Sequence, residues 1–476
     1  MRLACLAVAF SACTASSAAP APELAPAAPQ QFSEKRNEPV AESDASALQH
    51  ATRIVFVEDD FPGALELARR QGKALFVDAW AEWCHTCLSM QSYVFSDRSL
   101  APLAERVVFA SLDTDRDESA AFLARYAVDA WPTFFMLDPG TGRVLAQWQG
   151  AASTAEMRAF IAESLAALDA IRVQKLPTSS PLSLLMAAHE RHAASDFRAA
   201  AAAYAQALRA APDDWPRRSE ALYGRLQALG QSGQYDECAR FGIEHAERVS
   251  GAVTPSDFAR TLQRCSDNVA SPELRRAARR AALTRLRRIV EAPPPEMSVD
   301  DRADALEGYA EALIAEGDRN SARTVEQQRL RLMEEAAESA TSPQMAQTYD
   351  YGRARAYVAL GRAGEAVRLL EGRMRQLPDS YEPPARLASV LAQIGRHKEA
   401  LTAVERALQL SYGPRKLQYL ALKARILEAL GDRAAAIAAL EQEVQGYEAL
   451  PPGHANPRRV DDARKRLAAA RRAKPR

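Results

Sequence analysis

The chain has 476 residues, about three times the length of a typical domain, and 47% of them are hydrophobic, as in globular proteins. Lysine plus arginine and aspartate plus glutamate both number 61, so the formal net charge is zero. This balance gives no reason to expect a nucleic-acid partner, and beyond the N-terminal leader no stretch is apolar for long enough to cross a membrane.

Residues 1–19 have the features of an export signal: a positive charge at Arg2, a short apolar segment and a run of small residues. The sequence that ends at Cys13 resembles a lipobox, and lipidation of Cys13 would attach the mature protein to a membrane. Cleavage near Ala19 and release into the periplasm is the alternative. In both cases we expect a periplasmic or cell-envelope protein in an oxidising compartment, with residues 20–50 as a flexible linker.

Residues 51–173 alternate between helical and strand-like patterns, and this alternation predicts an α/β domain. The segment from Asp138 to Gly142 has the composition of a hairpin turn between the last two strands. The expected helices are Phe61–Gln71, Cys84–Val94, Ser119–Ala127 and Thr154–Val173, and the expected strands are Lys73–Trp80, Arg106–Leu112, Thr133–Leu137 and Arg143–Gln149.

Two cysteines with CxxC spacing, Cys84 and Cys87, stand where the apolar strand Lys73–Trp80 ends and a helix begins. A thiol at the start of a helix meets free N–H groups and the helix dipole, which lower its pKa from about 8.5 towards roughly 3.5–7.5. Cys84 would therefore be the nucleophile. Cys87, one helical turn further along, would stay protonated until it resolves a mixed disulfide with Cys84. Trp83, directly before the pair, is a candidate substrate contact.

Three other interpretations of the two cysteines have to be weighed. A structural zinc site usually needs four ligands, and although His85 is adjacent, no second pair of Cys or His lies nearby at ligand spacing. Covalent haem needs CxxCH, and Leu88 after Cys87 excludes it. The two cysteines could also be small core residues one helical turn apart. We predict neither a metal nor a cofactor.

The segment Val128–Asp138 resembles the part of the thioredoxin superfamily that carries a cis-proline facing the CxxC. The resemblance implies that Pro132 is this proline and that the backbone of Trp131 pairs with an extended substrate. An ordinary trans proline at the start of a strand is the alternative. The resemblance also implies that Asp78 is the buried acid that takes a proton from Cys87. Otherwise Asp78 would be a strand-end residue that points to solvent.

Within the superfamily, residues 54–168 are most similar to the C-terminal domain of the DsbD thiol:disulfide interchange proteins and to related exported thioredoxin-like proteins. Two positions depart from that pattern, namely His85-Thr86 inside the CxxC and the bulky Trp131. Both positions influence potential and substrate fit, so the likeness does not fix the direction of electron flow. A histidine inside the CxxC can stabilise the thiolate and make the protein more oxidising. The residues that carry the likeness are Gly72-Lys73, Ala81-Glu82-Trp83-Cys84 and Val94-Phe95-Ser96-Asp97.

After an expected linker at 174–182, residues 183–476 are organised by repetition. Turn signals recur between helix-compatible segments, and each is followed five positions later by a small residue that lets two helices approach closely. Two of the intervals are 34 and 36 residues, and the region resembles a tetratricopeptide repeat array. This resemblance implies an all-α helical solenoid with a concave face suited to a protein partner. The turn signals are Ser195, Gly233, Gly317, Gly361, Gly395 and Gly431, and the small residues are Ala200, Cys238, Ala322, Ala366, Ala400 and Ala436.

Cys238 and Cys265 are nearly equidistant from the turn at Ser250-Gly251. If the flanking helices run antiparallel, the two cysteines lie near each other, and an oxidising compartment would allow a structural disulfide. The alternative is that Cys238 is simply a small core residue, because five sister repeats have Ala at this position.

These features together predict an exported thiol–disulfide oxidoreductase with an α/β thioredoxin fold, followed by an all-α tetratricopeptide-like solenoid. Its partners would be protein substrates with disulfides or thiols, a redox partner protein, and a protein that the repeats recruit close to the dithiol. The alternative is a repeat-based scaffold or redox-sensing adaptor whose thioredoxin-like domain is not catalytic. The combination of Cys84, Cys87, Asp78 and Pro132 in one chain favours the enzyme.

Overall fold

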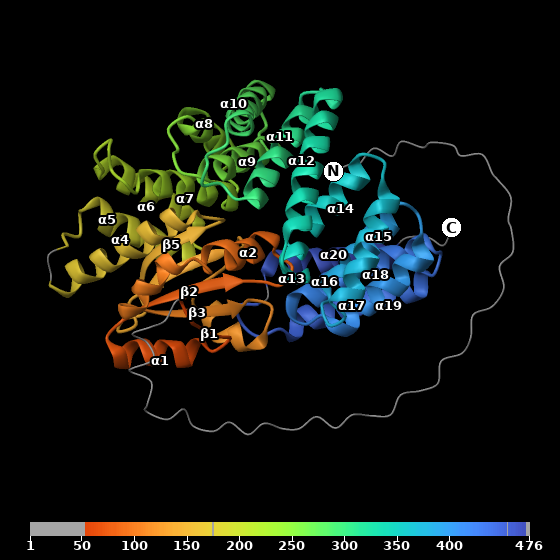
Figure 1. Ribbon diagram of the computed structural model, residues 1–476, viewed down its shortest axis with the longest axis horizontal. Helices are drawn as coiled ribbons and strands as arrows, with labels where there is room; N and C mark the ends of the chain where they lie inside the picture. Colours follow the sequence, from red (N-terminus) through yellow and green to blue (C-terminus); the bar gives the residue numbers. More distant parts are fainter. Residues whose placement is uncertain (1–52, 174–175, 455, 473–476) are drawn as a thin grey trace, which may run out of the picture. The chain divides into compact units, whose positions relative to one another are not determined.

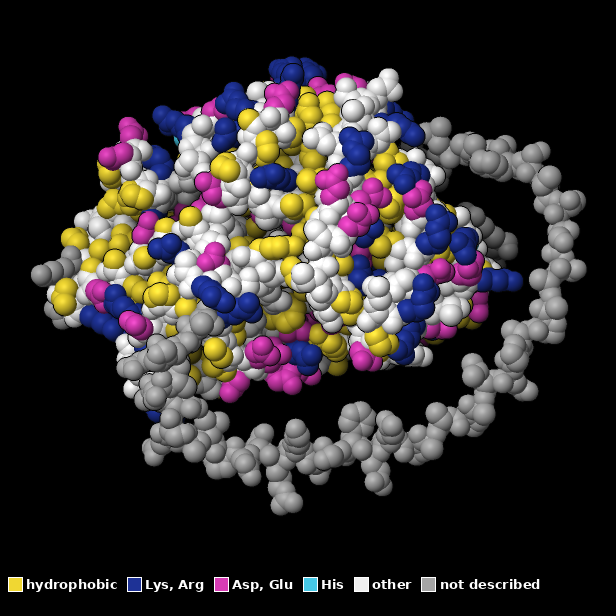
Figure 2. Space-filling view, in the orientation of Figure 1, with side chains coloured by type: hydrophobic (Ala, Val, Ile, Leu, Met, Phe, Trp, Pro, Cys, Tyr) yellow, Lys and Arg dark blue, Asp and Glu magenta, His cyan; other side chains and the backbone are white. Residues whose placement is uncertain are grey.

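The computed structural model describes residues 53–173, 176–454 and 456–472 (Figure 1). The expected leader, Cys13 and the linker at 20–50 lie outside these residues. None of the helices in the described ranges is both long and apolar enough to cross a membrane. On the face seen in Figure 2, basic and acidic side chains are interspersed, in keeping with the net charge of zero.

The described chain begins with a five-stranded mixed sheet and the helices that cover it. The strands are β1 (Phe56–Glu58), β2 (Ala74–Trp80), β3 (Val107–Asp113), β4 (Thr133–Leu137) and β5 (Val144–Gln149). The helices are α1 (Phe61–Gln71), α2 (His85–Ser89), the π-helical turn η2 (Met90–Val94), the 3₁₀ helices η3 (Arg98–Glu105) and η4 (Asp117–Ser119), α3 (Ala120–Leu123) and α4 (Thr154–Arg172). The strand order is β1-β3-β2-β4-β5. β3 is parallel to both β1 and β2, whereas β4 is antiparallel to both β2 and β5.

Alternate residues of the central strand β2 point to opposite faces of the sheet, and each face has its own core. Leu75 and Val77 belong to a core that includes residues of α1 and α3. Phe76 belongs to the core on the other face, with residues of η2 and α4. Asp78 continues the Phe76 series along the strand, so the sheet directs its side chain to the face that η2 covers.

Most of the expected elements of this domain are present, but three differ. The helix expected over Ser119–Ala127 is too long, because regular helix stops at Leu123 and the N–H of Ala127 donates instead to the carbonyl of Ala193, outside the domain. The helix expected over Cys84–Val94 starts one residue later and ends as the π-helical turn η2. The short strand β1 was not expected.

The rest of the described chain is a solenoid of helices in which successive helices pack against each other (Figure 1). Its first helix begins at Pro181, inside the segment expected to be a linker. The helices are α5 (Pro181–Ala193), α6 (Phe197–Ala210), α7 (Arg218–Gln231), α8 (Tyr235–His245), α9 (Thr254–Ser266), α10 (Pro272–Glu291), α11 (Val299–Ala315), α12 (Arg319–Ser339), α13 (Pro343–Gln347), α14 (Asp350–Ala359), α15 (Ala363–Gln376), α16 (Glu382–Gln393), α17 (His397–Leu410), α18 (Gly413–Ala429), α19 (Arg433–Ala449) and α20 (Pro457–Arg472).

The repeat signal has a direct structural cause. Each of the turn residues predicted from the sequence lies between two helices of the solenoid and has a positive φ, between 58° at Ser195 and 90° at Gly317. The small residues five positions later are all buried, at 3% exposure or less, where paired helices meet. The predicted fold class, an α/β thioredoxin fold followed by a helical solenoid, is confirmed.

The α8–α9 pair contains the two cysteines of the solenoid. Cys238 in α8 and Cys265 in α9 are joined by a disulfide, and their Cα atoms are 6.2 Å apart. Both side chains are buried in the core that α6 to α9 share. The bond therefore ties together two consecutive helices of the solenoid.

Candidate redox site

Cys84 and Cys87 lie at the start of α2, directly after the central strand β2. Cys84 caps the helix, and its Sγ accepts a hydrogen bond of 3.1 Å from the backbone N–H of Cys87. The two residues are joined by a disulfide, with Cα atoms 5.2 Å apart. Both are buried, at 5% and 2% exposure. The CxxC spacing thus places the two sulfurs together at one turn, in a site with very little open surface.

Tryptophan side chains surround the disulfide. Trp80, Trp83 and Trp131 pack against the cysteines, and the rings of Trp83 and Trp131 meet edge to face with centroids 5.1 Å apart. The indole Nε1 of Trp131 donates to the hydroxyl of Thr114 at 2.7 Å, and that of Trp83 donates to a carboxyl oxygen of Asp115 at 2.8 Å. These two bonds fix the orientation of the rings that cover the site.

The loop before β4 also reaches the dithiol. The peptide bond between Trp131 and Pro132 is cis, and the next residue, Thr133, pairs with Ala79 of β2. Because β2 leads directly to Cys84, this pairing holds the loop next to the CxxC. The two residues that the sequence singled out as substrate contacts on this loop, Trp131 and Pro132, therefore lie at the site.

Asp78 is a buried acid. Its side chain is 1% exposed, and neither carboxyl oxygen has a hydrogen-bond partner within the described part of the chain. Burial raises the pKa of Asp78 to about 8. This value is close to the ordinary thiol pKa of about 8.5. The carboxyl group does not point to open solvent, and it has a proton affinity similar to that of a thiol.

The solenoid forms one wall of the site. Arg386 of α16 donates from Nη2 to the backbone carbonyl of Trp83 at 2.9 Å. The guanidinium carbon of Arg415, in α18, lies 4.5 Å from the centre of the Trp83 ring. The hydroxyl of Ser380 donates to the carboxylate of Glu82 at 2.6 Å, and burial raises the pKa of Glu82 to about 7. The two residues directly before the CxxC are thus held by groups more than 290 positions away.

Inside the CxxC, His85 faces acidic residues of the solenoid. Its Nδ1 lies 3.0 Å from both carboxyl oxygens of Asp300 in α11, and its ring stacks on Tyr351 of α14 at 5.6 Å between centroids. Its Nε2 lies 3.9 Å from Asp304. Burial alone would lower the pKa of His85, but the charges of Asp300 and Asp304 raise it to about 9. The carboxyl groups of Asp300 and Asp304 therefore favour the imidazolium form of His85.

Two glycines show how closely the solenoid backbone approaches the sheet domain. A Cβ atom at Gly413 would lie 1.8 Å from the carbonyl oxygen of Asp115, and one at Gly453 would lie 2.5 Å from the backbone nitrogen of Ala124. Both glycines have positive φ, 54° and 95°. Since backbone atoms cannot rotate away as side chains do, only glycine fits at these contacts.

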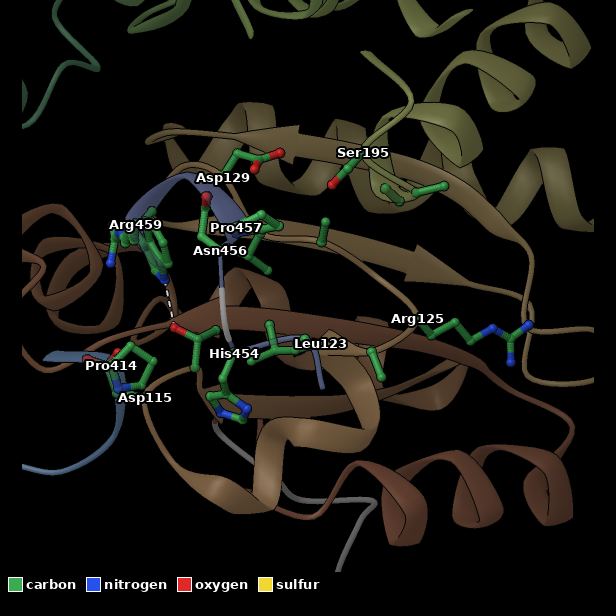
Figure 3. A pocket seen from close by; sticks show the side chains of 18 of the residues that line it. Asp115, Leu123, Arg125, Asp129, Ser195, Pro414, His454, Asn456, Pro457 and Arg459 are labelled. Carbon is green, nitrogen blue, oxygen red and sulfur yellow. Dashed lines mark hydrogen bonds between the residues drawn. The ribbon is translucent and has the colours of Figure 1, made fainter. Parts of the chain in front are cut away.

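A cavity of about 560 Å³ opens beside Trp83 and Trp131. Figure 3 shows Asn456, directly before α20, and Pro457 and Arg459 from its first turn among the residues that line the cavity. The remaining lining comes from the sheet domain, the ends of α5 and α7, the first turn of α18 and the turn before α20. The lining thus combines apolar side chains with polar and charged ones.

The sequence led to the cysteines, the tryptophans, Asp78 and Pro132, but not to the residues that complete the site. Asp115, Asp300, Arg386 and Arg415 carry no motif, and each reaches the CxxC only through the folding of distant helices and loops. The repeat pattern predicts helices around Asp300, Arg386 and Arg415, but no signal in the sequence identifies these residues or Asp115 as part of the site.

Comparison with known proteins agrees with this geometry. Residues 56–139 match the family model described as thioredoxin-like. The thiol:disulfide interchange protein DsbD of Pseudoalteromonas atlantica is 32% identical over 82 residues, which are 17% of this chain and 14% of that protein. Protein disulfide-isomerase 1 of Dictyostelium discoideum is 29% identical over 128 residues, 26% of this chain and 33% of the relative. The chain thus spans only a minor part of the curated relatives that it matches.

Among solved structures, a tetratricopeptide repeat protein from Parabacteroides merdae is similar to 61% of this chain and 98% of its own, at 13% identity and a TM-score of 0.40. Because this score is below 0.5, the solenoid architecture rests on the helix pairs and turns described above. Residues 56–139 contain a thioredoxin-like domain, and a tetratricopeptide-like helical solenoid follows it in the same chain.

Proposed function

We propose that the chain is an exported thiol–disulfide oxidoreductase that acts on protein disulfides through Cys84 and Cys87. The observation that carries this proposal is the disulfide-bonded CxxC at the start of α2, beside the cis-peptide loop of Trp131 and Pro132. The likeness of this domain to segments of a disulfide interchange protein and of a disulfide isomerase supports the same chemistry.

In the reduced form, the thiolate of Cys84 attacks one sulfur of a substrate disulfide, and that S–S bond breaks. The departing substrate sulfur takes a proton from solvent. Cys87 then gives its proton to ionised Asp78 and attacks Sγ of Cys84, which breaks the mixed disulfide and releases the second substrate sulfur. The substrate gains two electrons, and the disulfide seen in the structure is the product. Run in reverse, the same steps oxidise a substrate dithiol.

Asp78 assists the second step because its pKa, about 8, is close to that of a thiol. Transfer of a proton between two groups of similar pKa is nearly balanced in free energy, which suits a general acid–base role near neutral pH. The residues that would meet the substrate are Trp83, Trp131 and Pro132. The polar cavity beside them would admit an extended peptide segment.

The solenoid would recruit a protein partner or substrate and raise its effective concentration near the dithiol. We further propose a periplasmic or cell-envelope location, with Cys13 as the lipidation site or cleavage near Ala19. The disulfide between Cys238 and Cys265 is in keeping with an oxidising compartment. Mass spectrometry of the mature N-terminus decides between a lipidated Cys13 and a free residue near position 20.

The test is reduction of a model disulfide protein by the purified mature chain, with dithiothreitol as the electron donor. We expect turnover in the wild type and none above background in Cys84→Ser. Equal rates in the two proteins would remove the dithiol from the function and leave the solenoid as the active part.

A second candidate function has one observation in its favour. The dithiol is almost fully buried, and the solenoid contacts both neighbours of Cys84, Trp83 and His85, as a redox sensor that changes partner binding would require. In that case, reducing the CxxC would change the affinity of the solenoid for its partner, and Cys84→Ser would remove this dependence. If the affinity of the solenoid for its partner does not depend on the oxidation state of the CxxC, the sensor function has no support.

A further inference from the structure

The contact between His85 and Asp300 joins the CxxC to the solenoid. Nδ1 of His85 is 3.0 Å from each carboxyl oxygen of Asp300, and Asp300 is 4% exposed. The residues are 215 positions apart in the chain. Nδ1 is shared between the two oxygens in a bifurcated contact that points this edge of the ring at Asp300, and stacking on Tyr351 holds the face of the ring. His85 therefore has one defined orientation, and the solenoid supplies it.

The groups around His85 come from three helices of the solenoid. Asp300 and Asp304 lie on α11, the uncharged ring of Tyr351 lies on α14, and Arg386 of α16 is a cation that opposes protonation of the His85 ring. Asp304 is farther from His85, at 3.9 Å, and it is also paired with Arg260 of α9 at 2.9 Å. Asp300 is therefore the main countercharge of His85.

We propose that Asp300 is a positioning residue of the redox site: its carboxylate fixes the His85 ring and supplies the countercharge through which the solenoid controls the thiolate of Cys84. This inference rests on the proposed function of the CxxC. Under this proposal, residues of both the thioredoxin-like domain and the solenoid form the redox site. Separating the domain from the solenoid would therefore change the chemistry of the dithiol as well as its accessibility.

The physical reasoning concerns the charge next to Cys84. An imidazolium at the neighbouring position favours the thiolate and therefore the reduced form, which makes the disulfide more oxidising. Without Asp300, burial would favour the neutral imidazole, and the thiolate would lose this neighbour. In exchange with glutathione, the protein disulfide takes two electrons from two glutathione thiols, which leave as oxidised glutathione. The equilibrium constant of this exchange reports how far the reduced form is stabilised.

The experiment compares the full-length wild type with Asp300→Asn, His85→Gln and the double variant in glutathione buffers. We expect Asp300→Asn to disfavour the reduced protein by roughly tenfold, the change that accompanies a shift of about one unit in a thiol pKa. In the His85→Gln background, the same substitution should change the equilibrium constant by less than about twofold, because the effect passes through His85. No shift, a shift in the opposite direction, or an equal shift in both backgrounds would overturn the proposal.

The matched control is Asp301→Asn. Asp301 is also buried in α11, but it pairs with Ser298 and not with His85, and burial raises its pKa well above the ordinary value. Because Asp301 contacts Ser298 and not His85, its replacement by Asn should leave the equilibrium constant unchanged. A shift as large as that of Asp300→Asn would mean that α11 acts through packing alone, which contradicts the proposal.

A second readout does not depend on disulfide exchange. In chains whose only free thiol is Cys84, the ultraviolet absorbance of the thiolate gives its pKa directly. We expect this pKa to rise by about one unit in Asp300→Asn. If the wild type fails to exchange with glutathione but this shift is present, the proposed function fails while the role of Asp300 stands. If exchange occurs and the shift is absent, only the role of Asp300 fails.

Discussion

Replacing Asp78 by Asn should stabilise the fold and slow the reaction. At pH 7 the carboxyl group of folded Asp78, with a pKa of about 8, is protonated, whereas in the unfolded chain it ionises with a pKa of 3.8. The folded state binds more protons, so stability falls as pH rises from about 3.8 to about 8. At pH 7 the accumulated penalty is about 4 kcal/mol, and at pH 5 it is about 1.5 kcal/mol. Asn is uncharged in both states and removes this penalty.

The assay is urea unfolding followed by tryptophan fluorescence, which reports mainly on the thioredoxin-like domain because four of the five tryptophans lie there. We expect the gain in unfolding free energy of Asp78→Asn to grow between pH 5 and pH 7 by roughly 1.4 kcal/mol per pH unit. Release of the second substrate thiol should slow by on the order of tenfold to a hundredfold, because the substitution removes the ionised fraction of Asp78, a minority at pH 7, that accepts the proton of Cys87. A gain that does not vary with pH, or a variant that is both destabilised and fully active, would refute the reasoning.

Further substitutions test the interface, the second disulfide and a buried carboxylate. Gly413→Ala should separate the solenoid from the sheet domain and speed alkylation of the reduced dithiol by about tenfold or more. The control is Gly431→Ala, which costs a similar ~1 kcal/mol of backbone strain but places its Cβ within 4 Å of no other atom. This control should not change the alkylation rate. Equal rates in both variants would mean that the interface does not cover the dithiol. Replacing Cys238 and Cys265 together by Ala should lower the unfolding free energy of the solenoid by about 3 kcal/mol under non-reducing conditions. The rate of thiol–disulfide exchange at the CxxC should stay the same. A change in this rate would contradict the separation of the second disulfide from the redox site. Glu220 lies in α7, where burial by itself would raise the pKa of its carboxyl group. The guanidinium of Arg217 instead lowers this pKa to about 2. The contribution of Glu220 to the free energy of unfolding should therefore be complete above pH 4.5 and vanish as the pH falls to about 2. In urea unfolding, Glu220→Gln should lower this free energy by about 3 kcal/mol at neutral pH and leave it unchanged at pH 2.

The elements that the sequence predicts well are those with a strong local pattern. The apolar run of β2 and the CxxC after it define the start of α2, and the turns at Gly361 and Gly395 are recognisable because only a residue that tolerates positive φ fits there. The cis peptide before Pro132 was expected through family resemblance and not from its own neighbours. In each of these cases the information lies within a few residues of the feature itself, or in a known relative.

The parts that the sequence does not predict depend on distant contacts. β1 has only three residues, and its strand conformation comes from pairing with β3, about 50 positions later. The helix expected from Ser119 to Ala127 ends early because Ala127 bonds to the solenoid. The contact of His85 with Asp300 likewise spans 215 positions. No local propensity encodes such contacts, so the sequence identifies the dithiol but not the wall of solenoid residues that completes it.

Trapping the covalent intermediate tests the central claim most directly. If Cys84 attacks and Cys87 resolves, a reduced Cys87→Ser chain mixed with a disulfide-bonded protein should accumulate a mixed disulfide, and mass spectrometry should locate it at Cys84. The wild type should release the substrate, and a Cys84→Ser chain should trap nothing at comparable times. Absence of the adduct in Cys87→Ser, or equal trapping at Cys87 in Cys84→Ser, would contradict the assignment of Cys84 as the nucleophile.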